Sequence, residues 1–87
     1  MPALYRIEYA SLAARQLRKL PRDIQEQLRA DIEKLAEYPR PHGFEPYKKE
    51  PGTFRIRSGA YRIVYEIRDS ILLVLVLKLG HRRDIYR

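Results

Sequence analysis

The feature that most constrains this sequence is a run of seven apolar residues, Ile71–Leu77, close to the end of an 87-residue chain. The run is far shorter than the roughly 18 residues that cross a bilayer. It lacks the alternation of a half-buried strand, so it predicts a central strand covered on both faces. The remaining residues must therefore supply the neighbouring strands and a covering layer.

Three further segments have the composition of strands. Leu4–Tyr9 alternates, with Tyr5, Ile7 and Tyr9 on one face, and predicts a first strand. Phe54–Arg57 and Tyr61–Ile67 predict two more, joined through a turn at Ser58-Gly59. The last strand extends over Ile71–Leu79.

Apolar residues recur at helical spacing between residues 11 and 38. This pattern predicts two amphipathic helices that form a hairpin, the first capped by Ser11 and the second running from Arg22, just after Pro21, to about Tyr38. Residues 39–53 hold four of the six prolines and predict a loop. The order predicts an α+β fold: one domain over residues 1–87, in which an N-terminal strand and a helical hairpin pack on a mainly antiparallel four-stranded sheet.

Composition excludes several classes of protein. Hydrophobic residues make up 45% of the chain, which suits a globular fold. There is no cysteine and the two histidines lie far apart in sequence, so we expect no disulfide, no metal site and no cofactor. The N-terminus shows no signal-peptide pattern, so we expect a cytoplasmic protein with no membrane partner.

The net charge of +7 is unevenly distributed. Residues 1–38 hold seven basic and six acidic side chains, whereas residues 39–87 hold eleven basic and five acidic ones. A basic surface attracts polyanions, most often nucleic acid. The alternatives are charge that serves solubility, or a surface covered by an acidic protein.

The predicted hairpin places arginines on one face of the sheet. In Phe54–Arg57 the apolar side chains point one way and Arg55 and Arg57 the other. A tight loop at Ser58-Gly59 would put Arg55 opposite Arg62, and a four-residue loop would put Arg57 there. Like charges facing each other destabilise a sheet, so such a pair suits a site that binds an anion. The alternative is a solvated face on which the arginines lean on acidic neighbours.

The C-terminal segment concentrates polar chemistry after the buried strand, where Gly80 is expected to release the chain from the sheet. An imidazole, two guanidiniums and a phenol follow, from His81, Arg82, Arg83 and Tyr86. These groups suffice for RNA cleavage without a metal, which needs a base, an acid and cations that stabilise charge on phosphorus. Ordinary packing and a solvated basic tail remain the alternative interpretation.

Two segments, FRIRSGAYRIVYEI and LLVLVLKLGHRRDIYR, together resemble the RelE branch of the RelE/ParE toxin superfamily. The Pro-rich loop with Tyr47-Lys48-Lys49 and the strand-helix-helix opening match the same pattern. The resemblance implies an antiparallel sheet with two N-terminal helices, and cleavage of mRNA in the ribosomal A site. It also implies a cognate antitoxin, which we expect to be acidic and to dock a helix on the toxin.

The resemblance also implies roles for individual residues. Arg62 would contact the scissile phosphate, Arg82 would stabilise that phosphate or act as general acid, and Tyr86 would serve as base or stacking group. His81 is a second candidate acid or base. The residues expected to bind RNA or phosphate are Arg55, Arg57, Lys48, Lys49 and Arg83.

Two other functions stay open at this stage. A ParE-like inhibitor would act on DNA gyrase without cleaving RNA, although such proteins generally lack the GHRRDIY ending. A catalytically inactive module would persist as a partner of its antitoxin.

Overall fold

The computed structural model describes residues 4–47 and 50–85 of the chain. In chain order the elements are β1 (Arg6–Tyr9), α1 (Ser11–Arg18), α2 (Arg22–Lys34), β2 (Glu45–Pro46), β3 (Thr53–Ser58), β4 (Tyr61–Arg68), a 3₁₀ turn (Asp69–Ile71), β5 (Leu73–His81) and α3 (Arg82–Ile85).

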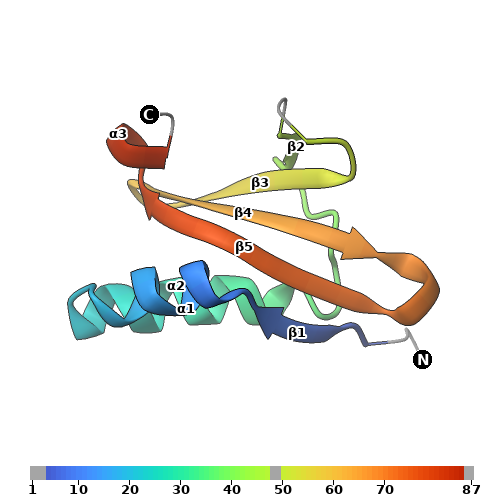
Figure 1. Cartoon of the computed structure of the whole chain (residues 1–87), viewed down its shortest axis with the longest axis horizontal. Helices are drawn as coiled ribbons and strands as arrows, with labels where there is room; N and C mark the ends of the chain where they lie inside the picture. Colours follow the sequence, from blue (N-terminus) through green and yellow to red (C-terminus); the bar gives the residue numbers. More distant parts are fainter. Residues whose placement is uncertain (1–3, 48–49, 86–87) are drawn as a thin grey trace.

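The strands form one sheet in the order β1-β5-β4-β3-β2 (Figure 1). β1 pairs parallel with β5, and every other pair is antiparallel. The predicted α+β fold with a mainly antiparallel sheet is therefore confirmed. The count of four strands was one too low, because Glu45–Pro46, inside the predicted loop, pairs with Phe54 and Arg55 of β3.

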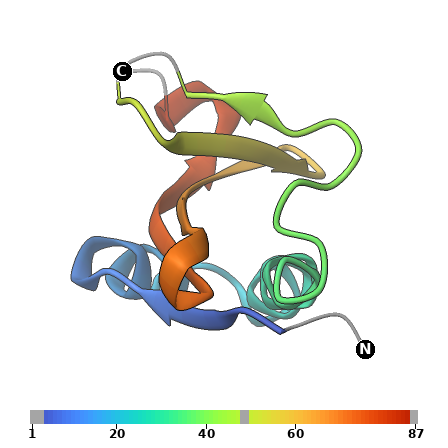
Figure 2. The same ribbon diagram turned by 90° about the vertical axis from the view of Figure 1, so that its right-hand side faces the viewer.

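The helical hairpin covers one face of the sheet, and α3 lies on the other (Figures 1 and 2). The main core lies between the hairpin and the sheet because the apolar stripes of both helices meet inward-facing strand residues there. Its buried members are Ala13, Leu17, Leu28, Ile32, Leu35, Ile56, Ile63, Tyr65, Val74, Val76 and Leu79. None of the helices within the described ranges combines the length and apolar character that a bilayer crossing requires.

Both helices differ from their predicted ends. Ala10, not Ser11, occupies the N-cap position of α1, and no side chain caps this helix. The reason is the sheet: the N–H of Ala10 donates to the carbonyl of Val76 at 2.8 Å, so strand pairing holds the residue that precedes the helix. α2 ends at Lys34, earlier than the predicted Tyr38, and residues 35–37 continue as turns.

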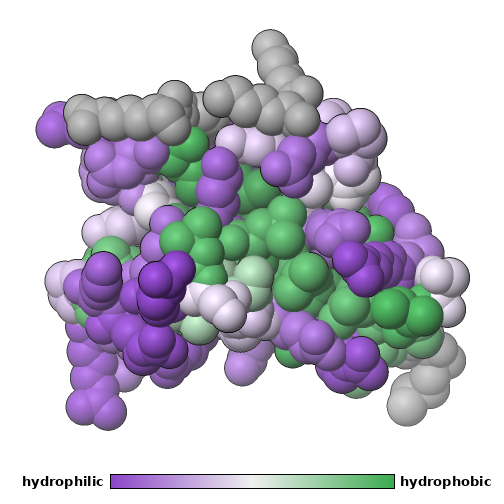
Figure 3. All heavy atoms as spheres, in the orientation of Figure 1, coloured by the Kyte–Doolittle hydropathy of each residue, from purple (hydrophilic) through white to green (hydrophobic). Residues whose placement is uncertain are grey.

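The apolar run Ile71–Leu77 is only partly a buried strand. Ile71 and Leu72 belong to the turn before β5 and are 53% and 39% exposed. Leu72 adopts a positive φ of 50°, which completes the reversal between β4 and β5. Hydrophobic surface continues along β5 to this turn (Figure 3). The run is interrupted because antiparallel pairing of β4 with β5 requires a turn between them.

A second, smaller cluster lies on the face of the sheet away from the helical hairpin, here called the outer face. Tyr47, Val64 and Ile85 are buried together, and Leu77 packs against them. This cluster joins the loop that follows β2 to α3 across the sheet. Because Ile63 and Tyr65 point into the main core, Val64 and its neighbours at alternate positions of β4 face outward.

Candidate functional site

The β3–β4 hairpin sets which arginines share the outer face. Ser58 pairs with Tyr61, so the loop consists of Gly59 and Ala60, and Arg57 lies opposite Arg62. The sequence left either Arg55 or Arg57 as the residue opposite Arg62, and the structure shows Arg57. The loop is a two-residue turn placed one position later than Ser58-Gly59, so neither predicted loop is correct. Gly59 has a φ of 61°, a conformation that glycine adopts without strain.

Side chains from α2 hold this hairpin in place. The hydroxyl of Ser58, which is buried, donates to Asp31 at 2.5 Å. The side-chain amide of Gln27 donates to the carbonyl of Ser58 at 3.0 Å and lies 3.2 Å from its hydroxyl oxygen. Lys34 forms an ion pair with Asp31 at 3.4 Å. These contacts tie the position of the arginines to the helical layer.

Three arginines and one carboxylate surround a hollow of about 40 Å³ at the end of the hairpin, lined by Glu45, Arg55, Arg57 and Arg62 together with Gly43 and Ile56. Arg55 pairs with Glu45 at 2.5 Å. The pKa of the Glu45 carboxyl is lowered, chiefly by the hydrogen bond from Arg55 and further by the positive charges of Arg57 and Arg62.

Positive charge exceeds negative charge in this cluster. Arg62 is only 9% exposed, and its Nη1 donates to the carbonyl of Tyr61 at 3.2 Å. Within residues 4–47 and 50–85, no ion pair joins Arg57 or Arg62 to a carboxylate. Because two like charges face each other across the strands, an anion bound between them would relieve their repulsion.

One cation of the outer face, Lys78, was not among the predicted site residues. It lies on β5 opposite Val64. Its Nζ donates to the hydroxyl of Tyr47 at 2.6 Å and lies 4.7 Å from the centroid of that ring. Lys78 is the single charged residue within the predicted strand Ile71–Leu79. A lone charge in an otherwise apolar strand was the sequence feature that could have identified it as a site residue.

The C-terminal candidates are divided between the two faces. His81 pairs with Tyr61, whose ring packs on the main core, and the two rings meet edge to face at 5.6 Å. Its Nδ1 accepts the N–H of Arg83 at 3.2 Å. His81 is therefore on the helical side of the sheet, whereas Arg62 of the neighbouring pair faces outward.

Arg82 begins α3 beside the hairpin. Its backbone N–H donates to the carbonyl of Ala60 at 2.9 Å, while Arg83 is exposed on α3. Gly80 pairs with Arg62 inside β5, so the chain leaves the sheet after His81 and not at Gly80 as predicted. The remaining candidates, Lys48, Lys49 and Tyr86, lie outside the described residues.

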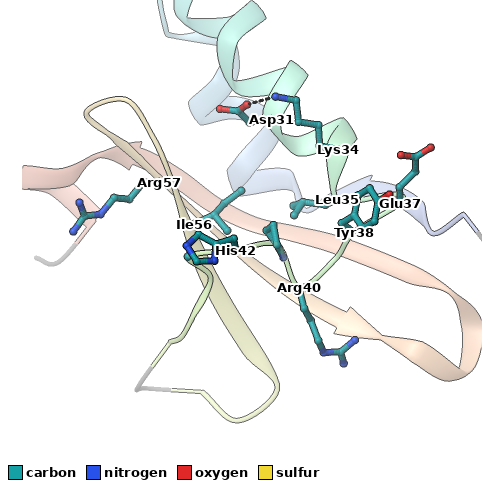
Figure 4. A pocket seen from close by; sticks show the side chains of 11 residues that line it. Asp31, Lys34, Leu35, Glu37, Tyr38, Arg40, His42, Ile56 and Arg57 are labelled. Carbon is teal, nitrogen blue, oxygen red and sulfur yellow. Dashed lines mark hydrogen bonds and ion pairs between the residues drawn. The ribbon is translucent and has the colours of Figure 1, made fainter.

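A larger hollow of about 750 Å³ opens between the end of α2, residues 40–43 and β3 (Figure 4). Leu35, Tyr38, Pro41 and Ile56 line its apolar part. Arg57 borders both this hollow and the smaller one. The apolar groove and the arginine cluster therefore adjoin each other.

The fold and the arginine-bearing outer face define a small α+β protein with a surplus of positive charge beside a β-hairpin. The chain belongs to the family described as the ParE toxin of the type II toxin-antitoxin system parDE, whose model matches residues 7–86. Its individual relatives place it in the RelE branch, so it is a RelE-type toxin of a type II toxin-antitoxin system. The resemblance read from the sequence is confirmed.

Two relatives and two solved structures illustrate the likeness. Toxin RelG of Mycobacterium tuberculosis is 39% identical over 88 residues, covering 95% of this chain and 97% of that protein. The mRNA interferase toxin RelE of Escherichia coli is 30% identical over 80 residues, covering 90% and 83%. The crystal structure of the toxin-antitoxin complex RelBE2 from M. tuberculosis has a TM-score of 0.82 at 32% identity, covering 94% and 95%. That of the isolated E. coli RelE toxin has a TM-score of 0.77 at 28% identity, covering 94% and 90%.

Proposed function

We propose that this toxin is a ribosome-dependent mRNA endonuclease that cleaves mRNA in the ribosomal A site and so inhibits translation. The observation that carries the proposal is the facing pair Arg57 and Arg62, which form no ion pair with a carboxylate within the described residues. The name of the E. coli relative, an mRNA interferase toxin, supports the same chemistry. Ribosomes translate in the cytoplasm, where this reaction would take place.

The reaction is an attack of a ribose 2′-oxygen on the adjacent phosphorus. As the new P–O2′ bond forms, the P–O5′ bond breaks, a base takes the proton of the 2′-hydroxyl and an acid protonates the departing 5′-oxygen. Arg57 and Arg62 hold the phosphate and stabilise the charge that builds on its oxygens, which guanidinium groups match in geometry. The arginines thus supply the positive charge that a metal ion would provide in a metal-dependent nuclease.

The proton carriers belong to the C-terminal segment. In the proposed mechanism Arg82 stabilises the phosphate or acts as general acid, and Tyr86 is the base or stacks on a nucleobase. His81 is the alternative carrier, but its contact with Tyr61 on the helical side means that its ring would have to turn to reach the phosphate. Lys48, Lys49 and Arg83 would add contacts to RNA phosphates.

The ribosome has a defined role in this proposal. The arginines bind a phosphate, but an in-line attack also needs the 2′-hydroxyl to be oriented. Such orientation lowers the activation barrier by several kcal/mol in favourable cases. Ribosome-bound mRNA would be presented in that geometry, so free RNA should be cut poorly. Efficient cleavage of naked RNA would contradict this reasoning.

A cognate antitoxin would silence the toxin. Several structural neighbours are crystal structures of toxin-antitoxin complexes, including RelBE2 of M. tuberculosis and RelBE of E. coli. We expect an acidic helical segment that covers the outer-face cations, because complementary charge favours rapid and specific association. A partner that binds through a basic segment would count against this expectation.

The deciding experiment maps cleavage on programmed ribosomes and on the same mRNA free in solution. Wild-type protein should cut only in the A site. The rate of this cleavage should fall by about 10²-fold or more in Arg62→Ala, because a contact to the transition state is lost. Arg82→Ala should lose cleavage as well, and Tyr86→Phe should lose it if the phenol is the base. Arg15→Ala, an exposed cation on α1, is the matched control and should cleave normally.

Two controls separate the alternatives. Cleavage should persist when EDTA is added together with enough excess magnesium to keep the ribosomes intact; its loss under these conditions would overturn the metal-free mechanism. Absence of cuts from folded protein would favour the ParE-like or inactive alternative, and a gyrase supercoiling assay would then distinguish these two.

A further inference from the structure

Neither the backbone conformation of Gly80 nor the packing of the described residues around it requires a glycine. Its φ lies outside the positive range that favours glycine, and within the described residues no heavy atom beyond its chain neighbours lies within 4 Å of the position of a Cβ. Glycine inside a strand weakens it, and such a residue often marks a place where a ligand approaches the backbone. The packing of the described residues therefore leaves space over the backbone of Gly80 for a ligand.

The space over Gly80 belongs to a hollow of about 210 Å³ between the end of β5, α1 and α3. Lys78, Asp84 and Ile85 line it on the side of the outer-face cluster, and Gln16 closes it on the side of α1. The walls are held in place: Gln16 accepts the N–H of Leu79 at 2.8 Å, and Ile85 is buried against Val64.

Gly80, which lines this hollow, lies in the same row of the sheet as the arginine pair. Arg57, Arg62 and Gly80 are register partners on β3, β4 and β5, so they form one row across the sheet. Neighbouring strands are about 4.8 Å apart, so the glycine is about one strand spacing from Arg62. The side chain of Arg62 lines the hollow shared with Glu45 and Arg57, toward β3 and away from Gly80.

We propose that the hollow floored by Gly80 is a nucleoside subsite, which holds the ribose and base of a nucleotide whose phosphate lies on Arg57 and Arg62. The missing side chain of Gly80 lets the sugar approach the strand. Lys78 donates hydrogen bonds to the nucleotide, and the Asp84 carboxylate accepts them from ribose hydroxyl or base amino groups. This inference rests on the proposed endonuclease function and specifies how that site would hold its substrate.

The first experiment measures binding without cleavage. Two probes are titrated into the purified toxin and followed by NMR: inorganic phosphate, and a dinucleotide whose 5′ residue is a 2′-deoxynucleotide and so cannot be cut. Wild-type protein should bind the dinucleotide at least tenfold more tightly than phosphate. Gly80→Ala should keep its phosphate affinity and lose most of this difference, because the added methyl occupies the subsite and leaves the arginines unchanged.

The second experiment measures cleavage and stability on the same variants. Gly80→Ala should unfold at the same or a higher temperature, yet its kcat/KM on programmed ribosomes should fall about tenfold, and further in Gly80→Val. A merely structural glycine would show the reverse, with stability lost and the activity of the folded fraction retained.

Asp84→Asn provides a test at an exposed residue of α3, where misfolding is not expected. Removing this negative charge should leave phosphate binding equal or tighter while weakening dinucleotide binding, and a uniform change for both probes would refute the subsite.

The two proposals can fail separately. If Gly80→Ala binds the dinucleotide and cleaves like wild type, the subsite inference is wrong although the endonuclease proposal stands. If wild type never cleaves but prefers the dinucleotide to phosphate, and Gly80→Ala loses that preference, the subsite stands and the endonuclease proposal fails.

Discussion

Replacement of Ser58 by alanine tests whether α2 holds the hairpin that carries the arginines. The substitution removes two contacts of a residue that is 2% exposed: the 2.5 Å hydrogen bond to Asp31 and the 3.2 Å contact with Gln27. The second hydrogen bond of Gln27, to the backbone carbonyl of Ser58, remains available. The variant therefore loosens the hairpin without removing an arginine.

The size of the effect follows from these contacts. A hydrogen bond to a charged group contributes about 1.5–3 kcal/mol and a neutral one about 0.5–1.5 kcal/mol. The Asp31 side chain is 32% exposed and keeps its ion pair with Lys34, so rehydration recovers part of the loss. We expect a net loss of about 1–2 kcal/mol, which for a domain of this size lowers the unfolding temperature by roughly 5–15 °C.

Thermal unfolding followed by circular dichroism measures this loss, and a double-mutant cycle with Asp31→Ala should give a coupling free energy of about 1 kcal/mol. Ser11→Ala is the matched control, since no side chain caps α1 and Ser11 is exposed. That control should stay within about 0.5 kcal/mol of wild type. An unfolding temperature of Ser58→Ala that equals that of the control, or strict additivity in the cycle, would refute the reasoning.

Three further outcomes can be checked by urea or thermal unfolding. Tyr65→Phe should cost about 1–3 kcal/mol, because it leaves the buried carbonyl of Pro39 without the 2.7 Å hydrogen bond from the tyrosine hydroxyl; an unchanged urea midpoint would contradict this. Hydrogen bonds from Arg40 and then Tyr5 lower the pKa of Asp69 from 3.8 to about 2, so its contribution to stability is present above pH 4 and lost as the pH falls toward 2. Between pH 6 and pH 3 the free energy of unfolding should therefore fall less in Asp69→Asn than in wild type. Equal falls in the two proteins would show that the Asp69 carboxylate does not stabilise the fold in this way. Leu72→Asn should raise stability by up to about 1 kcal/mol, since asparagine tolerates the positive φ of 50° better than leucine; a lower unfolding temperature would mean that the partly covered leucine contacts matter more.

Much of the fold could be predicted because its signals are local. Apolar spacing located both helices, and alternation located the strands on either side of the hairpin, since each pattern lies within a short stretch of chain. The pair Glu45–Pro46 escaped prediction because two residues in a proline-rich loop show no periodicity, and they become a strand only by pairing with β3. The position of His81 on the helical side of the sheet was not predicted for a related reason. Which face of the sheet a residue at a strand end points to depends on how β5 pairs with β4.

Long-range contacts decided what local patterns left open. The hydroxyl of Tyr5 donates to Asp69, 64 residues away in sequence, and Gln16 accepts the N–H of Leu79, 63 residues away. No pattern within a short window encodes such pairs. The space over Gly80 is likewise defined by α1 and α3 together, so it could not be recognised from the glycine alone.

The sequence by itself determined the order of the helical hairpin and the four longer strands, the surplus of positive charge in the second half of the chain and the residue types available for phosphate chemistry. Only the tertiary structure decided that Arg57, and not Arg55, lies opposite Arg62. The physical reason is the two-residue period of a strand: a shift of one residue in the turn changes which side chains face each other and which face they share. That choice is made by the geometry of Gly59-Ala60 and by the contacts of Ser58 with α2.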